Sequence, residues 1–146
     1  MSNYHELIKG KVFIGGADVA VQAIKEQGIT DVFDLREDGE KQEGFPETTT
    51  RHHYPIMEDR DDQEDFIKAA ILAVTKAVQS DKKVFFHCAG GRNRTGTVAT
   101  ALLINLNEAT TVEEAEKLAM ERRPDISIKP EMLKILKRMF EEESTN

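Results

Sequence analysis

The segment HCAGGRNRTG at residues 87–96 constrains the fold most, because it joins two stretches of different pattern. Residues 83–87 (KVFFH) form a short, largely apolar run that is typical of a buried strand. Residues 97–106 are nearly all apolar or small, which is typical of a helix buried on most sides. A strand, a glycine-containing loop and a helix in this order predict an α/β fold. In such a fold the loop N–H groups and the helix N-terminus form an anion-binding site.

The rest of the chain alternates short apolar runs with amphipathic stretches, as α/β domains do. Strands are expected at residues 11–14, 30–35, 49–56 and 83–87. Helices are expected at residues 17–27, 62–79 and 97–106, from a Thr-x-x-Glu capping box at Thr111 to about residue 122, and from Pro130 onward. This order predicts a central, mainly parallel sheet of about four to five strands with helices on both faces.

Length and composition indicate one domain over residues 1–146, because 39% hydrophobic and 32% charged residues are typical of a globular chain. No apolar run has the length of a transmembrane span or of a signal-peptide core, so a cytoplasmic location without membrane insertion is expected. The net charge of −7 disfavours nucleic acid as a partner, and a phosphate-bearing ligand must therefore be attracted by a local basic site. The sequence leaves the oligomeric state open.

Cys88 is the one cysteine of the chain, so an intramolecular disulfide and a multi-cysteine zinc site are both excluded. Its importance must then lie in thiol chemistry. His52 and His53 are adjacent on an expected strand, where successive side chains point to opposite faces and cannot share a metal ion. We expect neither a metal ion nor another cofactor.

Three side chains can turn the anion-binding loop into a reaction site. A thiolate at Cys88 would be stabilised by the positive end of the helix and would act as the nucleophile. Arg94 can hold two phosphoryl oxygens and stabilise the charge of the transition state. Thr95 is placed to donate a hydrogen bond to the Cys88 sulfur, which would help the thiolate to leave. The residues expected to bind the substrate phosphate are Ala89, Gly90, Gly91, Arg92, Asn93 and Arg94.

The pattern H-C-x-x-G-x-x-R-[ST]-G at residues 87–96 resembles the signature of the protein tyrosine phosphatase superfamily. The short chain also resembles the small dual-specificity branch of that superfamily, in the segments KVFIGG at 11–16, GITDVFDL at 28–35 and RRPDI at 122–126. The resemblance implies hydrolysis of a phosphomonoester in two steps through a phosphocysteine intermediate, without a metal or cofactor.

The resemblance also implies an aspartic acid that protonates the departing oxygen and then activates water. It is expected on the loop MEDRDD at residues 57–62. Asp59 is the assignment, because it is the first aspartate of the loop and lies 29 residues (88 − 59) before Cys88. Asp61 is the alternative. The family often has aspartate where Glu58 stands, so the alignment can shift by one residue.

The substrates implied are phosphorylated proteins, with phosphotyrosine first and phosphoserine or phosphothreonine as further candidates. The alternative is a phosphoinositide or another small phosphoester. Arg92 favours this alternative because it could contact a second phosphate, whereas Ala89 disfavours it because lipid-directed members often have lysine there. A phosphate-binding protein without catalysis and a rhodanese-like sulfur transferase are both disfavoured by the complete signature.

Three arginines outside the signature have other expected places in the fold. Arg36 follows an expected strand and is a candidate for the rim of the site. Arg122 and Arg123 are expected to stabilise the carboxyl end of the helix that precedes them.

Overall fold

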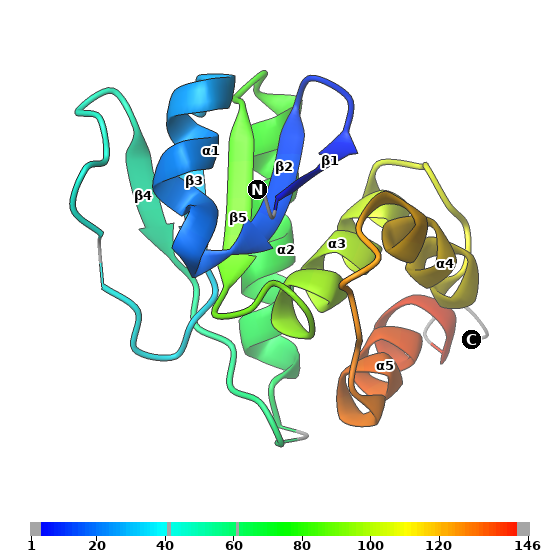
Figure 1. Ribbon diagram of the computed structural model, residues 1–146. Helices are drawn as coiled ribbons and strands as arrows, with labels where there is room; N and C mark the ends of the chain where they lie inside the picture. Colours follow the sequence, from blue (N-terminus) through cyan, green and yellow to red (C-terminus); the bar gives the residue numbers. More distant parts are fainter. Residues whose placement is uncertain (1–3, 41, 61, 143–146) are drawn as a thin grey trace.

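The computed structural model describes residues 4–40, 42–60 and 62–142. Five strands form one sheet in the order β1-β2-β5-β3-β4 (Figure 1). The strands are β1 (His5–Ile8), β2 (Val12–Gly16), β3 (Asp31–Asp34), β4 (Thr50–His53) and β5 (Val84–Cys88). All neighbours pair in parallel except β1 and β2, so the expected mainly parallel α/β sheet is confirmed.

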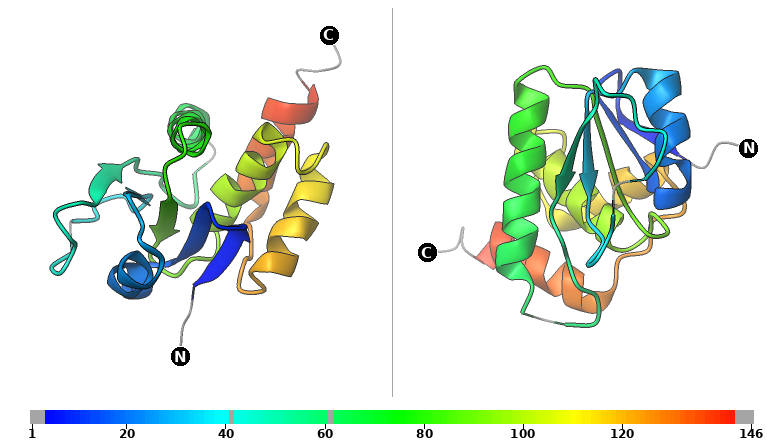
Figure 2. Two further views of the ribbon diagram at one scale, coloured as in Figure 1. Left: turned by 90° about the horizontal axis from the view of Figure 1, so that it is seen from above. Right: turned by 90° about the vertical axis from the view of Figure 1, so that its left-hand side faces the viewer.

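Helices cover both faces of the sheet, but unequally. The right-hand view of Figure 2 shows the strands between α1 on one side and α2 on the other. The helices are α1 (Ala20–Gln27), α2 (Glu64–Gln79), α3 (Arg94–Asn105), α4 (Val112–Arg122) and α5 (Pro130–Lys137). A 3-10 turn, η1 (Ala17–Val19), leads into α1, and a π-helical turn, η2 (Arg138–Glu142), follows α5.

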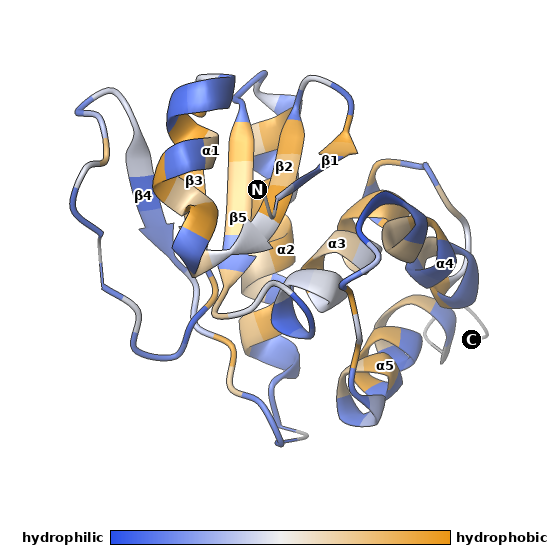
Figure 3. Cartoon of the chain, viewed as in Figure 1, coloured by the Kyte–Doolittle hydropathy of each residue, from blue (hydrophilic) through white to orange (hydrophobic). Residues whose placement is uncertain are grey.

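The core is divided by the sheet into a small and a large cluster. The small cluster packs α1 against Phe13, Val32 and Phe85. The large one packs α2, α3, α4 and α5 against alternate residues of the same strands, such as Ile14 and Phe86. Because both faces are covered, the inner strands β2 and β5 are apolar along most of their length (Figure 3).

Several expected boundaries shift in the structure. The strand expected at 49–56 ends at His53, and the helix expected from residue 62 begins at Glu64. The helix after the signature begins at Arg94 rather than at residue 97, so the signature arginine lies in its first turn. Strand β1 was not expected, because it is only four residues long and partly exposed.

The predicted helix signals at the other boundaries are confirmed. Gly28 ends α1 in the left-handed conformation, and Pro130 occupies the first turn of α5. Thr111 Oγ1 accepts a hydrogen bond from Glu114 N at 3.1 Å, but the Glu114 carboxylate bonds to Thr110 N at 2.8 Å rather than to Thr111. Within the described residues, no helix is both long and apolar enough to cross a membrane.

The parallel strands β2, β3 and β5 end at the same edge of the sheet. Gly16 lies beside Cys88 in the strand register, and Asp34 lies beside His87. In open α/β sheets this carboxyl edge is where ligands bind, so the fold places the signature segment at the expected position for a site.

Candidate active site

The signature loop, residues 87–96, packs tightly against the end of β2. Ala17 N donates a hydrogen bond to Ala89 O at 3.1 Å. Gly91 has a φ of 69°, and a Cβ there would lie 2.5 Å from the carbonyl carbon of Gly15. Only glycine avoids both the strain and the clash, so Gly91 allows the loop to close over β2.

Cys88 ends β5, is almost fully buried and contacts the first turn of α3. The Thr95 hydroxyl donates a hydrogen bond to Cys88 Sγ at 3.1 Å, which is the contact that the sequence pattern predicts. The same hydroxyl lies 3.5 Å from Gly15 O, a longer and weaker contact. A hydroxyl donor on the sulfur stabilises a thiolate more than a neutral thiol.

Arg94 extends from the first turn of α3 toward the segment between β4 and the acid loop, residues 57–62. Its Nη1 donates to Ile56 O at 3.3 Å, and its Nη2 lies 3.6 Å from Glu58 Oε1. Its Nε is buried and has no hydrogen-bond partner in the part of the chain that the structure describes. A guanidinium with such a donor fits an anionic oxygen next to Cys88.

Glu58, rather than Asp59, is the carboxylate of the acid loop that contacts the signature loop. Glu58 Oε2 accepts a hydrogen bond from Asn93 Nδ2 at 2.8 Å. Asp59 has a φ of 62°, its side chain is 77% exposed, and its Oδ1 lies 3.0 Å from Lys129 Nζ. The left-handed turn at Asp59 thus places the two neighbouring carboxylates in different surroundings.

Asp62, the other described carboxylate of the acid loop, has no hydrogen bond or ion pair with the described part of the signature loop. Asp61 lies outside the described residues. Asp62 is exposed and accepts hydrogen bonds from Arg60 and Gln63, which lower the pKa of Asp62 to about 2. The loop is closed at its end by Gln63 Oε1, which accepts a hydrogen bond from Met57 N at 2.9 Å.

Arg123 forms hydrogen bonds to the backbone of the signature loop, although it was expected only to stabilise the end of its own helix. Its side chain is 1% exposed. Its Nε donates to Gly91 O at 2.8 Å, its Nη2 donates to Gly90 O at 3.4 Å, and its Nη1 lies 2.9 Å from His5 Nδ1. Burial lowers the pKa of Arg123. The carbonyls of Gly91 and Gly90 are thereby paired within the protein.

The neighbouring Arg122 also lies elsewhere than expected, since its Nη1 donates to Leu7 O at 2.6 Å and so joins α4 to β1. The one signal for Arg123 in the sequence is its place in the RRPDI segment that resembles the family. Burial of an arginine could not be read from that segment, because a charged side chain is normally exposed.

A cluster of ion pairs lies at the end of β3, beside His87 in the strand register. Asp34 is fully buried and accepts hydrogen bonds from Arg36 Nη2 and Arg51 Nη2, both at 2.8 Å. Burial opposes ionisation of Asp34, but the bonds from Arg36 and Arg51 outweigh it and hold the pKa of Asp34 well below its usual range. Arg36, the rim candidate, is therefore engaged with Asp34.

The histidines are all held by separate partners. His87 Nδ1 lies 3.1 Å from Cys88 O, and burial lowers the pKa of His87. His52 contacts Asp31 at 2.8 Å and His53 contacts Arg36 O at 2.7 Å. Among the described residues, no three His, Cys, Asp or Glu side chains are arranged to hold a metal ion.

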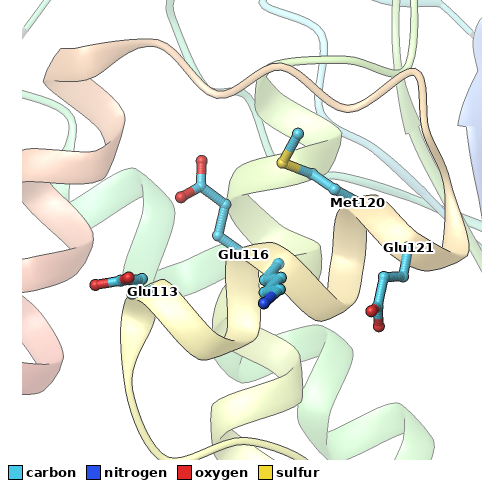
Figure 4. A pocket seen from close by; sticks show the side chains of 5 residues that line it. Glu113, Glu116, Met120 and Glu121 are labelled. Atoms are coloured by element: carbon cyan, nitrogen blue, oxygen red, sulfur yellow. The ribbon is translucent and has the colours of Figure 1, made fainter.

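A hollow on α4 lies apart from this site. Figure 4 shows it, and it is lined by Glu113, Glu116, Lys117, Met120 and Glu121. It shares no residue with the signature loop, and its three carboxylates would repel a phosphate group. The anion-binding features are therefore those of the signature loop.

Comparison with known proteins decides the family. The family model described as the dual specificity phosphatase catalytic domain matches residues 12–142, which is most of the chain. The chain belongs to the dual-specificity phosphatase family. It is a phosphatase of the protein tyrosine phosphatase fold, and the expected resemblance is confirmed.

Similar proteins match this dual-specificity phosphatase over different shares of their own length. The dual specificity protein phosphatase PHS1 of Arabidopsis thaliana is 28% identical over 117 residues, which are 77% of this chain but only 13% of PHS1. A variant of human DUSP28 matches with a TM-score of 0.84, 18% identity and 99% coverage of both chains. PTPMT1 matches with a TM-score of 0.78, 20% identity and coverage of 97% of this chain and 96% of that one. At these identities the structural matches concern the fold alone.

Proposed function

We propose that this phosphatase hydrolyses phosphomonoesters on proteins, first of all phosphotyrosine, through a phosphocysteine intermediate on Cys88. The observation that carries the proposal is the contact of Thr95 Oγ1 with Cys88 Sγ, in the same loop turn that presents Arg94. A buried thiol beside a hydroxyl donor and a guanidinium with an unpartnered Nε matches what an attack on phosphorus requires.

The first step moves the phosphoryl group to the enzyme. Cys88 Sγ attacks phosphorus, an S–P bond forms, and the P–O bond to the leaving group breaks as Arg94 stabilises the equatorial oxygens. The leaving oxygen takes a proton from a carboxylic acid of the acid loop. In the second step water attacks phosphorus and returns a proton to that carboxylate, while the S–P bond breaks and the thiolate leaves toward the Thr95 hydroxyl.

We assign the acid and base role to Glu58 because its carboxylate contacts Asn93 and lies 3.6 Å from Arg94. Asp59 remains the competing prediction from the sequence, with its carboxylate exposed beside Lys129. Glutamate has one methylene more than aspartate, so it reaches further from the same backbone position. The ordinary pKa values of glutamate and aspartate are similar. Either side chain can transfer a proton to an oxygen within hydrogen-bond reach.

Glu58→Gln and Asp59→Asn separate these two assignments. The acid is needed for a weakly acidic leaving group such as phenol and is nearly unnecessary for nitrophenol. The same group acts as base in the second step, so the comparison uses kcat/KM, which covers the reaction only up to release of the leaving group. Loss of the acid should lower kcat/KM about 100-fold or more on phenyl phosphate and less than about threefold on p-nitrophenyl phosphate. Glu58→Gln is expected to show this difference; if Asp59→Asn shows it instead, Asp59 is the acid.

A protein substrate is proposed on two grounds. PHS1 is described as a dual specificity protein phosphatase and is the relative detected by sequence. The chain also has Ala89, and not a lysine, beside Cys88. The second candidate is an inositol lipid, because Arg92 is exposed at the loop and PTPMT1, similar in fold, has a structure in complex with PI(5)P.

The deciding experiment measures phosphate release from a phosphotyrosine peptide and from phosphatidylinositol 5-phosphate, with chelator and fresh reductant. The wild type should release phosphate from the peptide, and Cys88→Ser should release none. Release from the lipid alone would replace the substrate class but keep the mechanism. Activity of Cys88→Ser on either substrate would overturn the thiol mechanism.

A further inference from the structure

Asn93 connects three segments that are far apart in the sequence. It precedes α3, occupies a variable position of the signature, and is 4% exposed. Its Nδ2 donates to Glu58 Oε2 at 2.8 Å, 35 residues away, and its Oδ1 accepts from Lys129 N at 2.8 Å, 36 residues away. Both polar ends of the carboxamide are thus used by groups outside the signature loop.

The orientation of this carboxamide follows from its partners. A backbone N–H can only donate, so the oxygen of Asn93 must face Lys129 N. The amide nitrogen then faces Glu58 Oε2, which accepts its hydrogen bond. An asparagine is therefore the side chain that both neighbours require, since aspartate would have no donor and a hydrophobic residue would satisfy neither.

Asn93 is itself fixed by the backbone around it. Its carbonyl oxygen accepts hydrogen bonds from Thr97 N and Thr97 Oγ1, both at 2.8 Å. Next to it, Arg92 O accepts a hydrogen bond from Ser127 N at 3.2 Å. A Cβ on Gly96 would lie 2.7 Å from Ile126 Cγ2, so the segment before α5 is in close contact with the start of α3. This packing gives Asn93 the rigidity that a positioning group needs.

Glu58 has no other contact as short as that with Asn93 among the contacts of the described residues. Arg94 Nη2 lies 3.6 Å and Lys129 Nζ lies 3.9 Å from its carboxylate oxygens. Without Asn93, the carboxylate would be free to approach Arg94, which is the group that the substrate phosphate needs. A neutral donor between the two holds the carboxylate near Arg94 without a direct ion pair.

We propose that Asn93 is a positioning residue that holds Glu58 at the phosphate site before substrate binds. The inference rests on the proposed role of Glu58 as acid and base. The acid loop is then attached to the signature loop in the free protein, and proton transfer to the leaving group does not wait for loop closure. Asn93 acts through Glu58 and takes no part in the chemical steps itself.

The test is a double-mutant cycle of Asn93→Ala and Glu58→Gln, measured as kcat/KM on phenyl phosphate and on p-nitrophenyl phosphate. Asn93→Ala should lower the ratio of kcat/KM on phenyl phosphate to kcat/KM on p-nitrophenyl phosphate by roughly tenfold, a part of the full effect of acid catalysis. In the Glu58→Gln background, Asn93→Ala should have no further effect on phenyl phosphate, because residues that act as one unit are not additive.

Asn105→Ala is the matched control, since Asn105 ends the same helix and donates to Thr75 Oγ1 at 3.2 Å, away from the signature loop. It should leave the ratio of the two rates unchanged. If Asn93→Ala does not fold, Asn93→Asp keeps the shape, removes the donor and places a like charge beside Glu58. It should lower the phenyl phosphate rate at least as much.

The outcomes distinguish the two proposals. If Glu58→Gln lowers the phenyl phosphate rate but the effect of Asn93→Ala persists in that background, Glu58 keeps its role and Asn93 does not act through it. If Glu58→Gln leaves both rates unchanged, the assignment of Glu58 fails and the role of Asn93 falls with it.

Discussion

The signature loop and the acid loop meet at one site, but they are held in different ways. The signature loop is fixed by buried contacts: Ala17 N on Ala89 O, the close approach of Gly91 to Gly15, and the guanidinium of Arg123. The acid loop is held mainly by side chains at or near the surface, among them the exposed pair of Arg60 and Asp62 and the contact of Lys129 with Asp59.

The difference corresponds to what each loop does in the proposed mechanism. A loop that stabilises charge must present its N–H groups without reorganisation, and a buried, fully paired backbone supplies that rigidity. An acid that gives and then takes a proton needs only a correct distance, which a few side-chain bonds can set. Changes in the signature loop should therefore affect all substrates and the stability. Changes in the acid loop should lower kcat/KM, which reports the first step, only for substrates with poor leaving groups.

Arg94→Lys should give the largest effect. Lysine keeps the positive charge but replaces the planar, multidentate guanidinium with a point charge that cannot hold two phosphoryl oxygens. We expect kcat/KM to fall about 1000-fold, the upper range for loss of one group that stabilises the transition state. The fall should be equal on phenyl and p-nitrophenyl phosphate; a fall confined to phenyl phosphate would place Arg94 on the acid side of the comparison.

Arg123→Met should show that the signature loop depends on a buried support. The change leaves Gly91 O and Gly90 O without their donor, and we expect the free energy of unfolding to drop by about 2–4 kcal/mol. Urea unfolding measures the drop, and the activity of the folded variant should fall to the same extent on both aryl phosphates.

Arg122→Met is the matched control for that change, because the neighbouring side chain bonds only toward β1 and Glu108 in the described structure. It should cost less stability and leave the activity close to that of the wild type. Equal losses for Arg122→Met and Arg123→Met would mean that Arg123 has no special part in supporting the loop.

Thr95→Val should slow the second step more than the first. Valine has the shape of threonine but lacks the hydroxyl that lies 3.1 Å from Cys88 Sγ. A hydrogen bond to a charged group contributes about 1.5–3 kcal/mol, so we expect phosphocysteine hydrolysis to slow by about 10- to 100-fold. Rapid mixing with p-nitrophenyl phosphate should reveal a burst of nitrophenol, and Thr95→Ser should restore the steady rate. A variant with no burst and a slow first step would contradict this role.

Gln63→Ala tests the other side of the comparison. The Gln63 amide oxygen accepts a hydrogen bond from Met57 N and so closes the acid loop. Its loss should let the Glu58 carboxylate move away from Arg94. We expect the rate on phenyl phosphate to fall severalfold, a small part of the contribution of acid catalysis, with p-nitrophenyl phosphate unaffected. Equal loss on both substrates would show that the acid loop also supports the signature loop.

The signature loop was predictable because its determinants are local. A buried strand, two glycines and a helix follow one another directly, and the geometry of Cys88, Arg94 and Thr95 follows from that order. Its support by Arg123 was not predictable, because this residue lies 32 positions from Gly91 in the sequence and reaches the loop only in the folded chain. Strand β1 escaped prediction for a related reason, since it forms only by pairing with β2.

The carboxylate of the acid loop that faces Arg94 was harder to predict, because neighbouring acidic residues differ mainly in the direction in which the backbone points their side chains. Whether Glu58 or Asp59 faces Arg94 is decided by the φ of 62° at Asp59, a conformation that is uncommon for residues other than glycine but tolerated by aspartate. Nothing in the letters MEDRDD fixes that angle. That the acid lies on this loop stays a prediction from the sequence, and only the backbone distinguishes Glu58 from Asp59.

The smallest predicted effect concerns the pH dependence of stability and His87. Burial lowers the pKa of His87 in the folded state, while in the unfolded chain a histidine has a pKa of about 6.5. Between these two values the unfolded state binds a proton that the folded state does not, so the free energy of unfolding rises with pH and falls as the pH drops below about 6.5. One proton limits the slope to about 1.4 kcal/mol per pH unit.

Urea unfolding at several pH values between 7.5 and 5 should therefore show that the free energy of unfolding declines toward acid. His87→Gln should reduce this decline. Burial also lowers the pKa of His5, so this residue should contribute to the decline that is left. Asp34 acts in a separate window. Since its pKa is held well below its usual range, its contribution is present above the unfolded value of about 3.9 and is lost as the pH falls below it. An unchanged slope in His87→Gln would mean that the buried side of the signature loop is not what makes the protein sensitive to mild acid.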